Sequence, residues 1–151
     1  MTLDAPRTFD QRRKDTLARF ENDVDVWVST ADGTGVPCLV PLSFLWDGRT
    51  FLLSTARASP TARNLHTHGR VRLAFGATRD VVLVEGTSTT AEVADLGPGE
   101  GAAFAVKTGF DPRDIRPAYP YFRITPVRIQ AWREVNEIAG RDLMKDGRWL
   151  G

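Results

Sequence analysis

The chain has 151 residues, a usual length for one domain, and we interpret residues 1–151 as a single domain. A formal net charge of only +1 argues against a dedicated nucleic-acid-binding protein, which usually carries a strong basic excess. No apolar run is as long as a membrane span, and the N-terminus has no signal-peptide pattern. The one cysteine, Cys38, excludes an intrachain disulfide, so we expect a cytoplasmic protein with no membrane partner.

Residues 8–21 have the pattern of an amphipathic helix. Thr8 is a suitable N-cap, and Gln11 follows it at the spacing of a capping box. Phe9, Leu17 and Phe20 then fall on roughly one face of the helix. We therefore expect this helix to pack on the rest of the protein through these three side chains.

The pattern changes to that of strands at about residue 24. Residues 24–30 alternate and are rich in β-branched side chains, and residues 36–46 form a long extended segment. Because Pro37 and Pro41 cannot donate to a strand ladder, we expect the second segment to be kinked or to lie at a sheet edge. The Asp-Gly pair at 47–48 predicts a hairpin into the next strand.

The second half of the chain repeats this pattern. Residues 69–76, 81–93 and 121–135 predict three more strands, the middle one with a kink at Gly86. Residues 96–110 predict a further helix after a Gly-Pro-Gly segment. Short hairpin connections imply antiparallel pairing throughout.

These segments together predict a mainly β protein. Six antiparallel strands over about residues 24–135 close most easily into a barrel, which removes exposed strand edges. Two or three helices would lie at its periphery. Residues 136–151 show no clear period, and we interpret them as a C-terminal tail.

Residues 54–65, STARASPTARNL, gather hydrogen-bond donors at one point of the chain. Ser59-Pro60 predicts a helix that begins at Pro60 and ends at Gly69. Its N-terminus, with free N–H groups and the positive end of the helix dipole, follows directly on a strand. The side chains that would add donors or charge there are Thr55, Arg57, Ser59, Thr61 and Arg63. The segment therefore suggests a phosphate site, although a plain N-cap with solvated arginines is the alternative.

The remaining motifs predict no catalytic side chain and no metal site. His66 and His68 are two residues apart, so they face different sides of a helix. The glycine-rich residues 97–101 do not lie between the strand and helix of a βαβ unit, and no nucleophile elbow or zinc-protease motif occurs. Trp132 or Trp149 would stack on a planar ligand if they do not serve packing.

The order of these segments resembles the pyridoxamine 5′-phosphate oxidase-like superfamily, the flavin-binding split β-barrels. The resemblance covers about residues 10–135, including the S-x-x-A-R-N-L helix that begins at Ser59. The segment ITPVRIQAWRE, followed by GRDLMKDGRWL, is similar to the tail of small actinobacterial members, some of which use the deazaflavin F420 in place of FMN.

The resemblance implies a homodimer with two cofactors, F420 or FMN, in grooves at the subunit interface. The strand Val40, Pro41, Leu42 and Ser43 would then run along the cofactor ring and offer backbone contacts. The cofactor phosphate would be held by Ser54, Thr55, Arg57, Ser59, Thr61, Arg63 and Asn64. Many family members carry a basic pair where this chain has Pro60-Thr61, so the phosphate would lose a cation there.

The function implied is that of a flavin- or F420-dependent oxidoreductase that transfers a hydride between the cofactor ring and a small organic substrate. Basic residues other than Lys14, Lys107 and Lys145 are arginines, whose guanidinium groups suit phosphate and the acidic tail of F420, which slightly favours F420 over FMN. The alternative is a non-catalytic barrel that binds or sequesters a flavin, haem or another planar ligand. An oligonucleotide-binding barrel is disfavoured because no strand face combines aromatic and basic residues.

Overall fold

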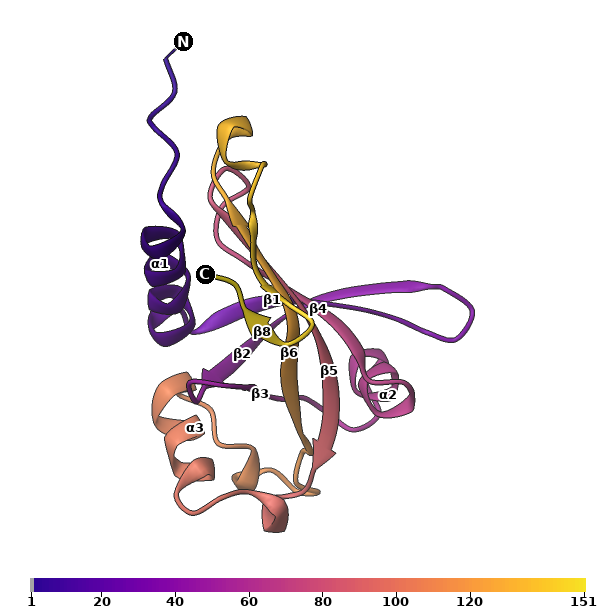
Figure 1. The fold of residues 1–151 in the computed structure, drawn as a ribbon. Coiled ribbons are helices and arrows are strands. Elements are labelled where there is room, and N and C mark those ends of the chain that lie inside the picture. The colour runs from indigo at the N-terminus through magenta and orange to yellow at the C-terminus, as the bar shows by residue number, and fades with distance from the viewer. Residues whose placement is uncertain (1) are drawn as a thin grey trace.

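Six antiparallel strands close into a barrel in the computed structural model, which describes residues 2–151 (Figure 1). The sheet order is β3-β2-β1-β4-β5-β6-β7-β8, and β3 also pairs with β6 to close the barrel. The strands are β1 (Asp25–Ala31), β2 (Pro37–Trp46), β3 (Phe51–Ser54), β4 (Arg70–Phe75), β5 (Val81–Ala91), β6 (Tyr121–Trp132), β7 (Asp142–Lys145) and β8 (Arg148–Trp149). The α-helices are α1 (Phe9–Asn22), α2 (Pro60–Thr67) and α3 (Glu100–Thr108). The predicted fold, a six-stranded antiparallel barrel with peripheral helices, is confirmed.

The kink predicted in β5 is present. The register of β5 against β6 shifts between Glu85 and Gly86, which marks a β-bulge. A Cβ atom at Gly86 would lie 2.6 Å from the Ile124 side chain, so only glycine lets the two strands approach this closely.

The first part of β2 lies at a free edge, as its prolines predict. Residues 37–43 pair only with β1, whereas residues 44–46 pair with β3. The Phe44 amide donates to the Val24 carbonyl at 3.0 Å. In an antiparallel ladder every second residue hydrogen-bonds the partner strand, so the residues of β2 that bond β1 have even numbers. Pro37 and Pro41, which have no N–H to donate, are not among them. The backbone groups of the intervening residues therefore point away from β1, along an unpaired edge.

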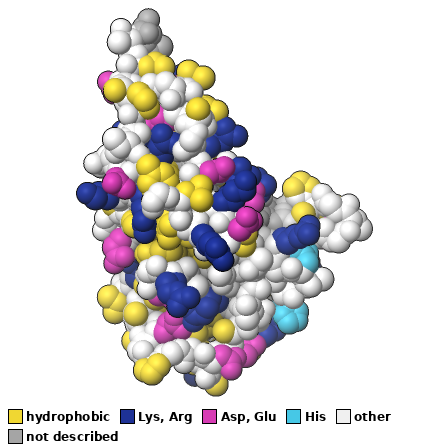
Figure 2. All heavy atoms as spheres, in the orientation of Figure 1, with side chains coloured by type: hydrophobic (Ala, Val, Ile, Leu, Met, Phe, Trp, Pro, Cys, Tyr) yellow, Lys and Arg dark blue, Asp and Glu magenta, His cyan; other side chains and the backbone are white. Residues whose placement is uncertain are grey.

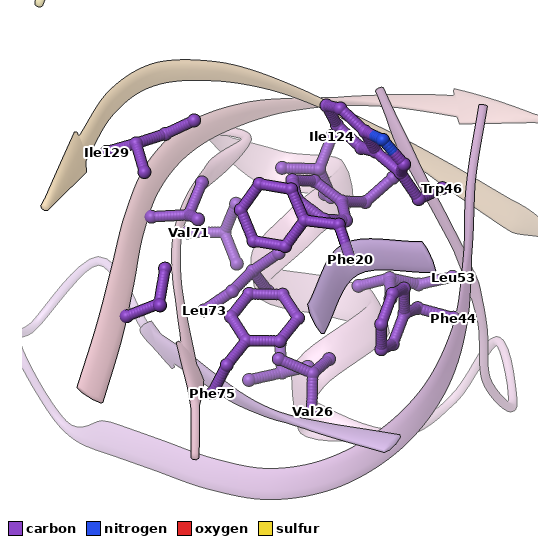
Figure 3. Packing of buried hydrophobic residues seen from close by; sticks show 14 of the residues in the cluster. Phe20, Val26, Phe44, Trp46, Leu53, Val71, Leu73, Phe75, Ile124 and Ile129 are labelled. Atoms are coloured by element: carbon purple, nitrogen blue, oxygen red, sulfur yellow. The ribbon is translucent and has the colours of Figure 1, made fainter. Parts of the chain in front are cut away.

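The aromatic core fills the barrel around Phe20 of α1 (Figure 3). The ring centroid of Phe20 lies 5.0 Å from that of Trp46, 4.8 Å from that of Phe51 and 4.9 Å from that of Phe75, and Phe20 is fully buried. The helix begins as predicted, with the Gln11 amide donating to Thr8 Oγ1 at 3.1 Å. The Gln11 side chain donates to Asp15 Oδ1 instead of returning to Thr8, so only half of the expected capping box forms.

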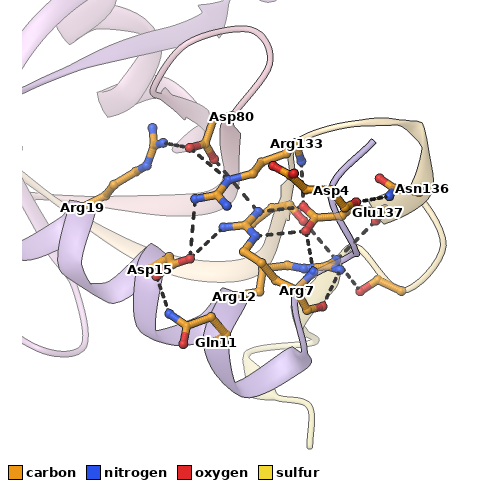
Figure 4. A network of polar contacts seen from close by, with 12 residues as sticks. Asp4, Arg7, Gln11, Arg12, Asp15, Arg19, Asp80, Arg133, Asn136 and Glu137 are labelled. Atoms are coloured by element: carbon orange, nitrogen blue, oxygen red, sulfur yellow. Dashed lines mark hydrogen bonds and ion pairs between the residues drawn. The ribbon is translucent and has the colours of Figure 1, made fainter. Parts of the chain in front are cut away.

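A polar network fastens α1 to the segment after β6 (Figure 4). The buried Arg12 guanidinium donates to the carbonyls of Ala131 at 3.2 Å, Glu137 at 3.3 Å and Gly140 at 3.0 Å. Arg7 donates to both carboxylate oxygens of Glu137. The network thus closes one end of the barrel with groups that are far apart in sequence.

Strands β7 and β8 form a hairpin within residues 136–151, where the sequence shows no hydrophobic periodicity and predicts only a tail. Their turn contains Asp146 and Gly147, with φ angles of 52° and 77°. An Asp-Gly pair is the usual sequence of such a two-residue turn. The tail therefore contains an Asp-Gly pair like the one that predicted the hairpin at residues 47–48. Its strands are too short to be identified from hydrophobic periodicity.

Candidate functional site

Helix α2 begins at Ser59 and Pro60, as the sequence predicts. The Ser59 hydroxyl oxygen accepts from the Ala62 amide at 3.1 Å, and the Ser59 carbonyl accepts from the Arg63 amide at 3.0 Å. The helix ends at Thr67, and Gly69 follows with a φ of +71°. Because Pro60 has no N–H, the Thr61 amide is the free backbone donor of this first turn.

Three of the predicted phosphate ligands are buried and hold the fold together. Ser54 Oγ donates to the Pro120 carbonyl at 2.8 Å, and Asn64 Nδ2 donates to Thr30 Oγ1 at 3.1 Å. Thr61 Oγ1 lies 3.5 Å from Cys38 Sγ. These side chains fix α2 and the end of β3 in place through contacts within the protein.

The two predicted arginines differ in what they contact. Arg57 donates from both terminal nitrogens to the two carboxylate oxygens of Glu92, at 3.0 Å and 2.9 Å, and this hydrogen bonding raises the pKa of Arg57. Arg63 is exposed and has no carboxylate partner within residues 2–151. Arg63 is therefore the free guanidinium at the start of α2.

The predicted ring-binding strand lies at the free edge of β2. Val40 and Leu42 are half-buried and pack against the core, whereas Pro41 points outward and is exposed. The Ser43 hydroxyl donates to Asp25 Oδ1 at 2.6 Å. The unpaired backbone edge and the outward side chains of Pro41 and Ser43 are thus available on the same part of the surface.

Most of the predicted residues line three separate hollows, and Val40, Ser59 and Thr61 line none of these. The residues from Pro41 to Ser43, together with Ser54 and Thr55, line a hollow of about 360 Å³ between β2 and α3, which we call the β2–α3 hollow. Arg63 and Asn64 line a second hollow of about 500 Å³, and Arg57 and Arg63 line a third of about 160 Å³. The structure therefore brings the strand that was predicted to bind the ring together with the end of β3, and it places the arginines in two other hollows.

Sequence reasoning missed the aromatic wall of the β2–α3 hollow. Helix α3 lies against β2 (Figure 1), and Phe104, Phe110 and Tyr119 line the side opposite the strand. The Phe104 ring packs edge-on against the Tyr121 ring at 5.6 Å, and the rings of Phe110 and Tyr119 lie 6.1 Å apart. Aromatic residues beside Gly109 and Pro120 were the available signal, but only the folded chain places them opposite β2.

Other candidate features lie elsewhere. The Arg13 guanidinium covers the Trp149 ring at 4.6 Å, and the Arg141 guanidinium lies 5.7 Å from the Trp132 ring. Within residues 2–151, no group of three or more His, Cys, Asp or Glu residues could hold a metal ion. No helix in this part of the chain has the length and apolar character needed to cross a membrane. Lys and Arg side chains on the face shown in Figure 2 are interspersed with Asp and Glu.

Comparison with solved structures places this fold among known split barrels. HupZ from Group A Streptococcus superposes with a TM-score of 0.61 at 21% identity, over 80% of this chain and 94% of HupZ. An F420 reductase gives 0.60 at 14% identity over 74% and 93%, and HutZ, the haem storage protein from Vibrio cholerae, gives 0.60 at 12% identity over 91% and 99%. Identities this low establish the common fold and nothing further.

Sequence comparison identifies the family itself. No curated protein matches the chain. The family model described as pyridoxamine 5′-phosphate oxidase matches residues 14–134, which span the barrel and all three α-helices except the first turn of α1. The chain therefore belongs to the pyridoxamine 5′-phosphate oxidase family.

Proposed function

We propose that the protein is an oxidoreductase that uses F420 or FMN to transfer a hydride between the cofactor ring and a small organic substrate. The observation that carries this proposal is the position of the free edge of β2. Residues of this edge and of the end of β3 line the same hollow, the β2–α3 hollow. In this family, a cofactor ring along that edge would leave its phosphate near the start of α2.

The groups that remain free at the start of α2 fit one phosphate. They are the Thr55 hydroxyl, the Thr61 amide and the Arg63 guanidinium, and the Ser59 hydroxyl keeps its own hydrogen to donate while its oxygen caps the helix. A helix N-terminus favours an anion through its free N–H groups and its dipole. With Pro60-Thr61 in place of a basic pair, Arg63 is the one guanidinium at this point, among residues 2–151, that is not paired with a carboxylate.

The cofactor supplies the hydride chemistry when it is bound. The chain would bind and orient it: the unpaired backbone groups of Leu39 and Ser43 would hydrogen-bond the polar edge of the ring, and Arg63 would neutralise the phosphate. The aromatic side chains across the hollow would keep water away from the reacting face. This division of work requires no acid or base from the protein.

F420 is the slightly favoured cofactor. The basic residues near α2 are arginines, which bind phosphate and carboxylate through paired N–H groups, and F420 carries both kinds of anion. The likeness to an F420 reductase supports this choice, while FMN remains a common ligand of the family.

An exposed apolar surface supports a homodimer. Trp27 is 50% exposed and Leu39 61% exposed, on the outer face of β1 and β2, and Trp27 lies opposite the exposed Pro41. Large apolar side chains grouped on one face favour burial against a second protein surface. Sedimentation analysis should give a dimer for the native protein, and Leu39→Lys should shift it towards monomer.

A non-catalytic module that binds a flavin, haem or another planar ligand is the second candidate. Two observations favour it: the start of α2 offers a single free guanidinium, and HutZ, a haem storage protein, shares the fold. This candidate predicts ligand binding without turnover.

Fluorescence titration of the purified protein with FMN, F420 and riboflavin tests the proposal. We expect binding of F420 or FMN at micromolar concentration, and Arg63→Ala should weaken phosphate-bearing cofactors much more than riboflavin. Arg79→Ala, an exposed arginine on the turn between β4 and β5, is the matched control. If neither cofactor binds, the proposal fails; if a bound, reduced cofactor is never oxidised by any acceptor, the non-catalytic module is the correct function.

A further inference from the structure

The β2–α3 hollow has one charged residue in its lining, and this residue is an acid. Asp25 lines the hollow together with three aromatic residues, Phe104, Phe110 and Tyr119. A volume of about 360 Å³ suits a small organic group. The inference below rests on the proposed function, because it concerns the substrate that would lie beside the ring.

The charge of Asp25 is not neutralised by the protein. Its carboxylate is exposed and accepts a hydrogen bond from the Ser43 hydroxyl at 2.6 Å. No Lys or Arg of residues 2–151 forms an ion pair with it. Nearby carboxylates differ in this respect: Glu100 pairs with Arg123, and Asp111 with Arg113.

Lys107 of α3 does not line the hollow. Lys107 is the single cation of α3, and its ammonium group lies 4.8 Å from the ring centroid of Phe44. Its other charged neighbours are Glu21 and Asp23, near the end of α1. The Lys107 ammonium group thus lies over Phe44, which does not line the hollow, and it forms no ion pair with Asp25.

The aromatic residues of the hollow also favour a positively charged ligand. Phe110 and Tyr119 are half-buried, with their rings inclined at 54° to each other, whereas the buried Phe104 is held in place by Tyr121. The face of an aromatic ring carries partial negative charge and attracts a cation placed over it. A carboxylate without an ion-pair partner and aromatic rings in the lining of one hollow make a surface complementary to an organic cation.

We propose that the β2–α3 hollow binds a positively charged group of the substrate, a protonated amine or a quaternary ammonium. Asp25 supplies the opposing charge, Ser43 orients its carboxylate, and Phe110 and Tyr119 supply ring faces. The substrate class of the oxidoreductase is then a small organic cation that reaches the cofactor from the α3 side of β2.

Calorimetric titration of the full-length protein with three matched probes tests this inference. Benzyltrimethylammonium is the cation, benzyl alcohol the neutral probe and phenylacetate the anion. We expect the cation to bind most tightly and the anion most weakly. Replacing Phe110 or Tyr119 with Leu should weaken the cation about three- to thirtyfold and change benzyl alcohol much less.

Asp25→Asn should weaken the cation about three- to tenfold and leave benzyl alcohol unchanged, because it removes the charge and keeps the shape. Asp10→Asn is the control, since Asp10 is exposed and does not line the hollow. Equal affinity for the cation and the anion, or equal effects of the two aspartate substitutions, would overturn the inference.

The same titration is repeated at a saturating concentration of the cofactor that binds. Cation binding that persists supports the inference, whereas competition between the two would mean that the hollow belongs to the cofactor and would overturn it. If a cofactor binds and the cation does not, the inference fails and the proposed function stands. If the cation binds as predicted and neither cofactor does, the cation site is supported and the proposed function fails.

Discussion

Arg57 and Glu92 face each other through two parallel hydrogen bonds, from the terminal nitrogens of the guanidinium to the two carboxylate oxygens at 3.0 Å and 2.9 Å. Both side chains are largely exposed, so the pair is readily opened. Because Glu92 occupies both terminal nitrogens of Arg57, a cofactor phosphate bound by Arg57, as we propose, would have to compete with Glu92.

Glu92→Gln should therefore strengthen the binding of a phosphate-bearing cofactor. The substitution keeps the shape of the side chain and frees Arg57, so we expect the Kd for FMN or F420 to fall about three- to tenfold at low salt, and less at high salt. Fluorescence titration measures this, with riboflavin as the ligand that should not change. Glu134→Gln, which changes a half-buried carboxylate paired with Arg79, is the control variant. A riboflavin response as large as that of FMN would show that Arg57 does not meet the phosphate.

Phe20→Ala should be among the most destabilising single changes in the chain. Phe20 is fully buried among Trp46, Phe51 and Phe75, so its loss leaves a cavity where α1 meets the barrel. Such a change costs about 3–5 kcal/mol of unfolding free energy. Urea unfolding measures the loss, with Phe9→Ala, a half-buried position on the same helix, as the comparison. Similar losses at both positions would contradict the central place of Phe20 in the core.

The sequence predicted the strands well because alternation, proline and Asp-Gly pairs act locally. Pro37 and Pro41 predicted that residues 37–43 lie at a sheet edge, and Gly86 predicted the bulge in β5; the structure shows both. Ser59-Pro60 predicted the start of α2 for the same reason: an N-cap and a proline in the first turn depend only on neighbouring residues.

The candidate site was less predictable because its side chains form hydrogen bonds with residues that are far away in sequence. Ser54, Asn64 and Thr61 have the chemistry of phosphate ligands, but they contact Pro120, Thr30 and Cys38, respectively. Pairing of Arg57 with Glu92 joins residues 35 positions apart. Residue type indicates what a side chain can bind, whereas only the tertiary contacts decide what it does bind.

Protein stability should fall in acid partly through Glu137. Arg7 donates to its carboxylate from the side chain at 2.8 Å and 3.0 Å and from the backbone at 2.9 Å, and these contacts lower the pKa of Glu137 from 4.5 to about 2. Because the folded-state pKa lies below the unfolded value, the stabilisation is fully present above about pH 4.5. It is lost as the pH falls towards 2. A shift of this size corresponds to about 3 kcal/mol.

Glu137→Gln should thus lower the unfolding free energy at pH 7 by about 2–3 kcal/mol, and the difference from the native protein should shrink between pH 5 and pH 2. Urea unfolding at several pH values measures this. Asp10→Gln, an exposed carboxylate in the first turn of α1, is the control, and it should show little change. Parallel pH profiles for the native protein and Glu137→Gln would contradict the role of Glu137.

Removing either of two buried hydroxyls, those of Tyr121 and Ser54, should change the unfolding free energy in different ways. The Tyr121 hydroxyl has no hydrogen-bond partner within residues 2–151, and burial raises the pKa of Tyr121, so this group stays a neutral, unpaired dipole. Tyr121→Phe should leave the unfolding free energy unchanged or raise it by about 1 kcal/mol, since nothing is lost but a desolvated polar atom.

Ser54→Ala is the matched contrast, since it should lower the unfolding free energy by about 1–3 kcal/mol. The Ser54 hydroxyl donates to the buried Pro120 carbonyl, and its removal leaves that acceptor unsatisfied. Urea midpoints of the two variants, measured side by side, give the comparison. A loss for Tyr121→Phe as large as that for Ser54→Ala would mean that the tyrosine hydroxyl is hydrogen-bonded in solution, through a buried water or a subunit contact.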